Sequence, residues 1–138
     1  LGSRGLGDVY KRQVMNRAIY LDRRKFDKFD DNHFIVYLNE ETIPEYVPEV
    51  MEGQPEPEPC TAYAYSGSEK DGGTIIEATS AQYDDFVAGL VRLKFSQNQV
   101  EAILCNQGDG NDEHLAEYNA LQLYRKDCKA VAAELLAR

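Results

Sequence analysis

The sequence contains no tryptophan, only two histidines and three cysteines, and its net charge at pH 7 is −9. No apolar run approaches the ~18 residues that a membrane-spanning helix needs, so no membrane partner is expected. The negative charge repels phosphate backbones, which argues against general nucleic-acid binding. It leaves room for a local basic site that binds one small anion.

The cysteines and histidines show no metal-binding or redox spacing. Cys60, Cys105 and Cys128 are far apart, and His33 and His114 belong to no paired histidine motif. We therefore expect reduced, mostly buried thiols in the cytoplasm of the producing cell, with no metal and no cofactor. The acidic segment 109–113 resembles the start of a calcium-binding loop, but the match fails at the sixth position, where His114 stands in place of the required glycine.

Catalytic signatures are also missing. No nucleophile motif surrounds Ser66, Ser80 or Ser96, and the adjacent Asp84 and Asp85 would point in different directions on a helix. The sequence therefore predicts no catalytic residue and favours binding over catalysis.

With 138 residues, the chain fits one domain. Its first half reads as short strands and its second half as helices, which predicts an α+β fold. We expect a small antiparallel sheet of three to four strands followed by three helices, the last one long and amphipathic. Strand patterns rich in β-branched and aromatic residues occupy residues 17–21, 32–38, 60–65 and 74–78, and the glycines of 66–73 suggest a hairpin loop.

Two segments between these strands lack a clear pattern. Residues 22–30 are charged, with Phe26 and Phe29, and are interpreted as a helical turn or an irregular loop. All five prolines lie within residues 44–59 among glutamates, which predicts an acidic, extended, Pro-rich loop.

The helices carry recognisable start signals. Thr79 or Ser80 is a candidate cap for a helix that runs through Tyr83 and on to Lys94. Ser96 and Gln99 form a capping box for a second helix, and a break at residues 108–111 precedes a last helix that begins at Asn111 or Asp112.

One face of the last helix carries an apolar heptad row, in which residues recur at alternating intervals of three and four. The row could pack on the protein's own sheet, or it could form a homo-oligomer interface. The predicted interface residues are Leu121, Tyr124, Cys128, Val131 and Leu135.

Arginine and tyrosine are concentrated near the predicted strands. Arginine binds phosphate through two parallel hydrogen bonds, and tyrosine faces stack on nucleobases. These properties suggest a pocket for a small anionic nucleotide, although the same arginines could instead pair with the surplus carboxylates. The candidate ligand-binding residues are Tyr20, Arg23, Arg24, Tyr37, Tyr65 and Arg92.

Residues 8–13 read Asp-Val-Tyr-Lys-Arg-Gln, and one back-translation of this stretch resembles the end of a transposon adapter used to prepare sequencing libraries. Residues 1–13 are therefore interpreted as a disordered assembly artefact from metagenomic sequencing. We expect a single domain over residues 14–138, with translation that starts at Met15.

Three segments in the second half resemble small accessory proteins of Bacteroidales gut phages, which are often encoded near tail genes. The segments are residues 83–87, 93–102 and 124–129. The resemblance transfers no site. It implies a phage protein that acts in the infected bacterial cell.

The interpretation that we favour is a non-enzymatic homo-oligomer that sequesters a nucleotide immune signal, such as a cyclic ADP-ribose isomer or a cyclic dinucleotide. The alternative is a tail or tail-fibre assembly protein. A nucleotide-cleaving enzyme that uses Asp22 or Glu77 is a third hypothesis. Ligand identity and oligomer size are open.

Overall fold

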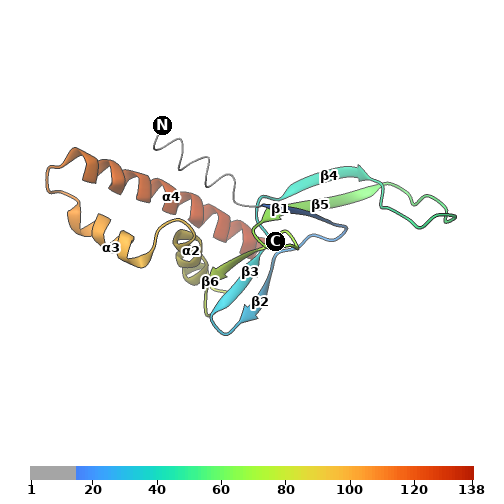
Figure 1. Cartoon of the computed structure of the whole chain (residues 1–138), viewed down its shortest axis with the longest axis horizontal. Coiled ribbons are helices and arrows are strands. Elements are labelled where there is room, and N and C mark those ends of the chain that lie inside the picture. Colours follow the sequence, from blue (N-terminus) through green and yellow to red (C-terminus); the bar gives the residue numbers. More distant parts are fainter. Residues whose placement is uncertain (1–14) are drawn as a thin grey trace. The chain divides into compact units, whose positions relative to one another are not determined.

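The structure, a computed structural model, describes residues 15–138 (Figure 1). The interpretation of residues 1–13 as an artefact lies outside these residues. The described chain has six strands followed by three helices, so the predicted α+β class is confirmed. It forms two compact units: one holds the residues up to Phe26 together with Ile35–Ile75, and the other holds Asp27–Phe34 and Ile76–Arg138.

The first antiparallel sheet has the strand order β1-β5-β4, with β1 at Asn16–Tyr20, β5 at Cys60–Gly67 and β4 at Glu41–Tyr46. In the central strand β5, Ala62, Ala64 and Tyr65 are buried. The register pairs Ala18 of β1 with Tyr65, and Ile43 of β4 with Ala62. The predicted strands at 17–21 and 60–65 are confirmed to within two residues.

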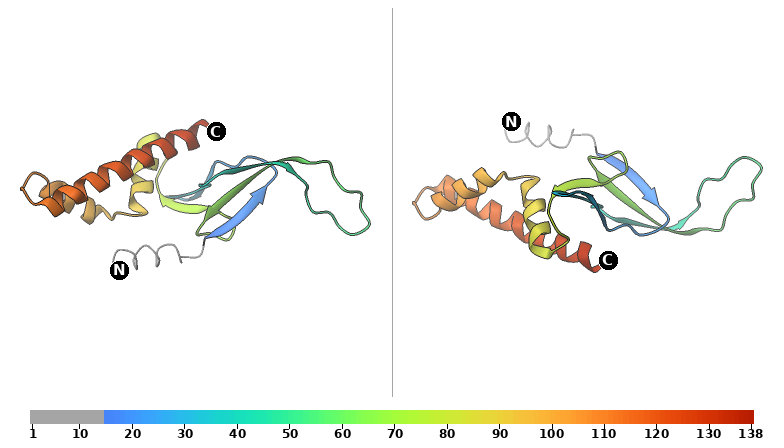
Figure 2. Two further views of the ribbon diagram at one scale, coloured as in Figure 1. Left: turned by 90° about the horizontal axis from the view of Figure 1, so that it is seen from above. Right: turned by 90° about the horizontal axis from the view of Figure 1, so that it is seen from below.

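Strand β4 corrects the predicted extent of the Pro-rich loop. The loop was expected to begin at residue 44, but Pro44 lies inside β4. Proline is tolerated there because β4 is an edge strand, where an N–H can point away from the ladder. The pairing with β5 shifts register between Ile43 and Tyr46, and Glu45 adopts a left-handed φ of 55°. The loop between β4 and β5 therefore comprises residues 47–59, and it extends beyond the ends of both strands (Figure 2).

The second antiparallel sheet has the order β2-β3-β6, with β2 at Phe26–Asp30, β3 at His33–Val36 and β6 at Thr74–Glu77. Strand β2 was predicted to be a helical turn or loop, and this was wrong. The side chain of Asp30 shapes the tight turn into β3, because its Oδ1 accepts the backbone N–H of Asn32 at 2.8 Å. The phenylalanine spacing in β2 resembled a helix, but the turn and the pairing with β3 determine the strand.

The expected hairpin pairing of β5 with β6 is also corrected, because the two strands belong to different sheets. Residues 67 and 73 nevertheless approach closely. A Cβ added to Gly67 would lie 2.2 Å from the carbonyl oxygen of Gly73, so only glycine fits there. The glycine-rich segment does make a turn, as predicted, but the strands diverge after it.

Helix α2 (Tyr83–Arg92) begins without the expected cap. Its N-cap residue is Gln82, which makes no side-chain cap hydrogen bond. Ser80 instead donates its hydroxyl to the carboxylate of Asp85 in the first turn. Thr79 and Ser80 were therefore wrong as caps.

Helices α3 (Gln97–Asn106) and α4 (Asp112–Ala137) begin as the sequence predicts. Ser96 Oγ accepts the N–H of Gln99, and the Gln99 side chain accepts the N–H of Ser96, which completes the capping box. Asn111 caps α4 through the N–H groups of Glu113 and His114. Helices α2 and α3 both pack against α4 (Figure 1).

Candidate functional site

The structure brings five of the six predicted ligand-binding residues together in the first unit. Arg24 lies between two tyrosine rings, with its Cζ 5.0 Å from the Tyr20 centroid and 4.7 Å from the Tyr37 centroid. Its Nη2 donates to Tyr37 Oη at 3.0 Å. The rings of Tyr37 and Tyr65 make an edge contact at 5.6 Å. Arg92, the sixth residue, lies in the other unit.

The hydrogen-bonding groups of this cluster are satisfied by the protein itself. Arg23 makes two hydrogen bonds to Glu40, both 3.0 Å long. Tyr65 donates to the same carboxylate at 2.7 Å, and Tyr37 donates to Asp71 at 2.9 Å. Burial, and then the hydrogen bond to Asp71, raise the pKa of Tyr37 above its ordinary value, so the phenol stays a neutral donor.

The predicted stacking of a nucleobase on Tyr37 and Tyr65 is corrected by their burial, whereas Tyr20 is half-buried. Tyr37 is 2% exposed and Tyr65 is 0% exposed, so neither ring has a free face. The cluster therefore fixes the fold of the first unit, and the alternative that its arginines pair with surplus carboxylates describes it better.

We expect Tyr65→Phe to reduce the free energy of unfolding by about 1–2 kcal/mol, because it removes a buried hydroxyl that two partners need. The hydroxyl accepts the backbone N–H of Arg24 at 2.9 Å and donates to Glu40. Urea denaturation measures the change. The matched control is Tyr63→Phe on the same strand, whose ring is only half-buried; it should cost less than about 0.5 kcal/mol. Equal effects of the two substitutions would contradict the proposed network.

The heptad row of α4 is buried within the chain. Leu121 and Leu135 are 0% exposed and Cys128 is 4% exposed. Tyr124 donates its hydroxyl to the Leu90 carbonyl of α2 at 2.9 Å, and only Val131 of the row has an exposed side chain. Side chains without accessible surface cannot bury more against a second copy, so the predicted oligomer interface at this row is corrected. The partner of the row is chiefly α2 rather than the sheet that the other interpretation named.

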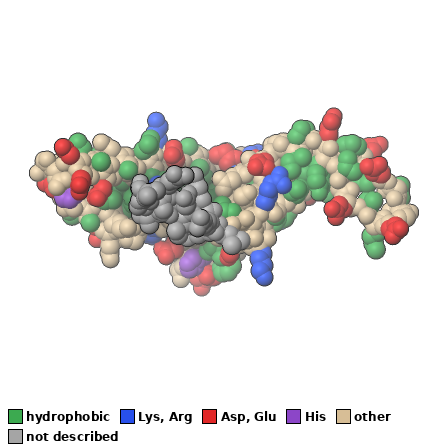
Figure 3. All heavy atoms as spheres, turned by 45° about the horizontal axis from the view of Figure 1, so that its top comes forward, with side chains coloured by type: hydrophobic (Ala, Val, Ile, Leu, Met, Phe, Trp, Pro, Cys, Tyr) green, Lys and Arg blue, Asp and Glu red, His purple; other side chains and the backbone are tan. Residues whose placement is uncertain are grey.

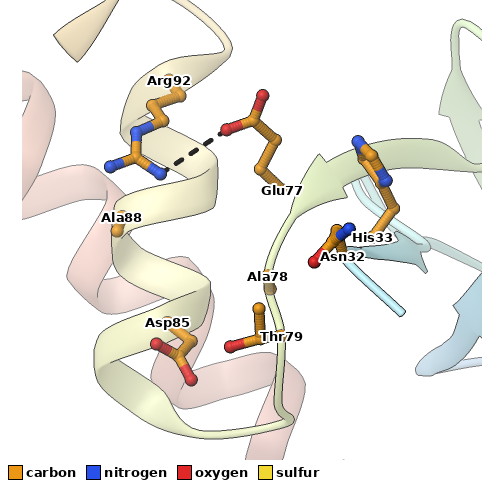
Figure 4. Close-up of a pocket in the computed structure, with 8 residues that line it drawn as sticks. All are labelled: Asn32, His33, Glu77, Ala78, Thr79, Asp85, Ala88 and Arg92. Atoms are coloured by element: carbon orange, nitrogen blue, oxygen red, sulfur yellow. Dashed lines mark ion pairs between the residues drawn. The ribbon is translucent and has the colours of Figure 1, made fainter. Parts of the chain in front are cut away.

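Arg92 lines two cavities of the unit that contains the three helices. The first, of about 430 Å³, is bounded by α2, by β6 and by the turn between β2 and β3 (Figure 4). Glu77 faces Arg92 across it, with 3.5 Å between their charged atoms, and Asp85 faces Thr79 at the other end. Two carboxylates for one arginine make this cavity a poor site for an anion.

The second cavity, of about 380 Å³, is a groove formed by α2, α3 and α4. We call it the helical groove. The apolar side chains of Val87, Val91, Val100 and Leu104 line it. Its polar lining comprises three cations, one acid, one glutamine and one tyrosine. These residues are Arg92, Arg125, Lys129, Asp84, Gln97 and Tyr83.

The local sequence explains why the cations and the aromatic ring meet there. Arg125 and Lys129 are four residues apart and therefore lie on one face of α4. Tyr83, Val87 and Val91 follow the same spacing on α2, and the Tyr83 side chain is 41% exposed. Among residues 15–138, neither Arg125 nor Lys129 has an ion-pair or hydrogen-bond partner. Arg92 contributes less positive charge, because it contacts Glu77 and donates to Gln97.

Sequence reasoning identified Arg92 but missed the rest of the groove. Arg125 and Lys129 are basic residues of the last helix, and Tyr83 lies in the helix α2. Their spacing was the available signal, but it could not show that the two helix faces meet.

Within residues 15–138, no three His, Cys, Asp or Glu side chains converge in a way that could bind a metal ion. Nor does any helix of this range have the length and apolar character needed to cross a membrane.

The fold and the groove define a small α+β protein with a basic, partly apolar surface groove. The chain matches no family model, no curated protein and no solved structure.

Proposed function

We propose that this chain is a non-enzymatic binding protein that holds a small anionic nucleotide in the helical groove. The observation that carries the proposal is the composition of the groove: two cations with no partner among residues 15–138, Arg125 and Lys129, next to an exposed aromatic ring, Tyr83. The ligand site is thus moved from the buried tyrosine cluster to α2, α3 and α4, and Arg92 is the residue kept from the original prediction.

The groove suits the two parts of a nucleotide. Its volume of about 380 Å³ lies within the ~300–1,000 Å³ range of small-molecule sites. Arg125 and Lys129 can make charge-assisted hydrogen bonds to phosphate oxygens, while the Tyr83 ring can stack on a base. The valine and leucine side chains offer apolar contact to the ribose and the base edge.

The biological role we propose is sequestration of a nucleotide immune signal in the cytoplasm of a phage-infected bacterium. The resemblance of residues 83–87, 93–102 and 124–129 to gut-phage accessory proteins supports this role. All three segments belong to the unit that contains the groove. A protein that only sequesters a signal needs affinity and no catalytic group, in keeping with a groove of cations and apolar side chains.

The test is calorimetric titration of the full chain with cyclic ADP-ribose isomers and cyclic dinucleotides. We expect one of them to bind, and Arg125→Ala together with Lys129→Ala to weaken binding at least ~10-fold, because a hydrogen bond to a charged group contributes about 1.5–3 kcal/mol. The matched control is Lys126→Ala, an exposed cation of α4 that does not line the groove and should leave affinity unchanged.

Chromatography of the recovered ligand separates sequestration from cleavage. Intact ligand supports a binding protein, whereas conversion to product would favour the enzymatic hypothesis. Absence of heat with every nucleotide, from a folded protein, would remove the proposal.

A further inference from the structure

The loop of residues 47–59 displays apolar side chains to solvent. Val47 is 40%, Val50 44% and Met51 76% exposed. The same loop contains four glutamates and no cation. Hydrophobic and acidic side chains accordingly alternate on the surface of the β4–β5 hairpin (Figure 3). Large apolar side chains gathered on an exposed loop are typical of a surface that binds a partner.

The backbone of this loop is suited to docking in an extended form. Pro48, Pro55, Pro57 and Pro59 fix φ at four positions, which lowers the conformational entropy lost when the loop is ordered by a partner. Pro55, Pro57 and Pro59 alternate with Glu56 and Glu58, so carboxylates recur at every second residue. A partner for this segment must offer apolar contacts flanked by positive charge.

The helical groove has this combination of properties. Leu104, which is 38% exposed, and the half-buried Val100 supply the apolar surface, and Arg125 and Lys129 supply positive charge that no partner among residues 15–138 neutralises. The loop and the groove are therefore complementary in charge and in apolar character, although the chain as a whole is strongly acidic.

We propose that residues 47–59 of one copy dock into the helical groove of a second copy of this chain. The contact is heterologous because it joins two different surfaces. A docked pair therefore keeps one unused loop and one unused groove, which can close into a ring or bind further copies. The proposal goes beyond ligand binding, but it uses the same groove. The glutamates of the loop then occupy the place of the ligand's phosphates, and nucleotide and loop compete.

The experiment uses sedimentation velocity on the full chain and on two charge-reversed variants. The loop variant carries Glu49→Lys, Glu52→Lys and Glu56→Lys, and the groove variant carries Arg125→Glu and Lys129→Glu. We expect the wild type to associate as its concentration rises and to dissociate in ~1 M salt, where charges are screened beyond ~3 Å. Each variant alone should be monomeric, because it lacks one of the two surfaces.

Mixing the two variants should restore association as a one-to-one heterodimer, formed by the intact loop of the groove variant and the intact groove of the loop variant. A third chain that carries both sets of reversals should associate again, since its loop and groove have exchanged charge. Circular dichroism checks that each variant is folded. The substituted glutamates are exposed, so their reversal should leave the spectrum unchanged.

Three results would overturn the inference: a wild type that stays monomeric at all concentrations, association that both variants retain, or variants that fail to recombine. Calorimetry on the loop variant keeps the two proposals apart, because its groove is intact. Nucleotide binding by this variant, together with a wild type that stays monomeric, would reject only the docking. Self-association of the wild type that the loop variant loses, together with no nucleotide binding by the loop variant, would reject only the ligand.

Discussion

Phe86→Ala should lower the free energy of unfolding by about 3–5 kcal/mol, the largest loss that we expect from a single truncation in this protein. Phe86 is 0% exposed, and its ring meets that of Phe34 at a centroid distance of 5.3 Å. Removing the ring eliminates its buried area and leaves a cavity between α2 and β3. Chemical denaturation followed by circular dichroism measures the change.

The matched control is Phe29→Ala in β2, which removes the same side chain from a position that is 57% exposed. Its cost should stay near 0.5 kcal/mol, the usual size for a surface substitution. Since a typical domain is stable by only about 5–15 kcal/mol, the Phe86 variant should be close to unfolding at 37 °C. Similar losses from the two substitutions would show that α2 does not pack on β3 as described.

Gly89→Ala should be destabilising, by at least about 2 kcal/mol, although alanine is the better helix former. Helix propensity alone favours alanine by about 1 kcal/mol. At this position, however, an added Cβ would lie 2.4 Å from the carbonyl oxygen of Glu77 and 3.2 Å from Cβ of Ile76. The backbone atom cannot move aside as a flexible side chain would, so α2 must shift away from β6, at a cost near or above the ~3 kcal/mol upper end for overpacking.

The control is the reverse change at the neighbouring exposed position, Ala88→Gly, which measures propensity on its own. It should cost about 1 kcal/mol. Thermal denaturation of both variants decides the sign at position 89. A Gly89→Ala variant that is more stable than the wild type would mean that α2 and β6 do not approach as closely as the structure shows.

The helices could be predicted because their signals are local. The Ser96–Gln99 capping box and the Asn111 cap need only neighbouring residues, and both are present. The predicted cap of α2 was wrong because the Ser80 hydroxyl forms a hydrogen bond with Asp85 rather than with a backbone N–H. A hydroxyl with two possible partners gives no indication in the sequence of which one it takes.

The strands β2 and β4 were missed for a different reason. Phe26 and Phe29 are spaced as in a helix, and Pro44 usually argues against a strand. What determines these strands is pairing with residues far along the chain, such as Ile43 with Ala62. Such long-range pairs have no signature within a short window of sequence.

The site shows the same limit. Arg23 and Arg24 are next to each other in sequence with tyrosines near them, which suggested a binding pocket. The sequence could not reveal that Arg23 and Tyr37 form hydrogen bonds with Glu40 and Asp71, which lie 17 and 34 residues further along the chain. Equally, the heptad row of α4 is compatible with an internal or an external partner, and only the position of α2 decides between them.

The left-handed residue and the proline of β4 together affect how this protein can aggregate. An open sheet edge normally offers a regular series of N–H and C=O groups to which a foreign strand can add, as in amyloid growth. Here Pro44 lacks a donor and Glu45, with its φ of 55°, breaks the regular spacing of the groups that remain. Both features therefore disfavour fibril-like extension along the β4 edge, and copies that meet at this edge are expected to recognise each other through side chains rather than through their backbones.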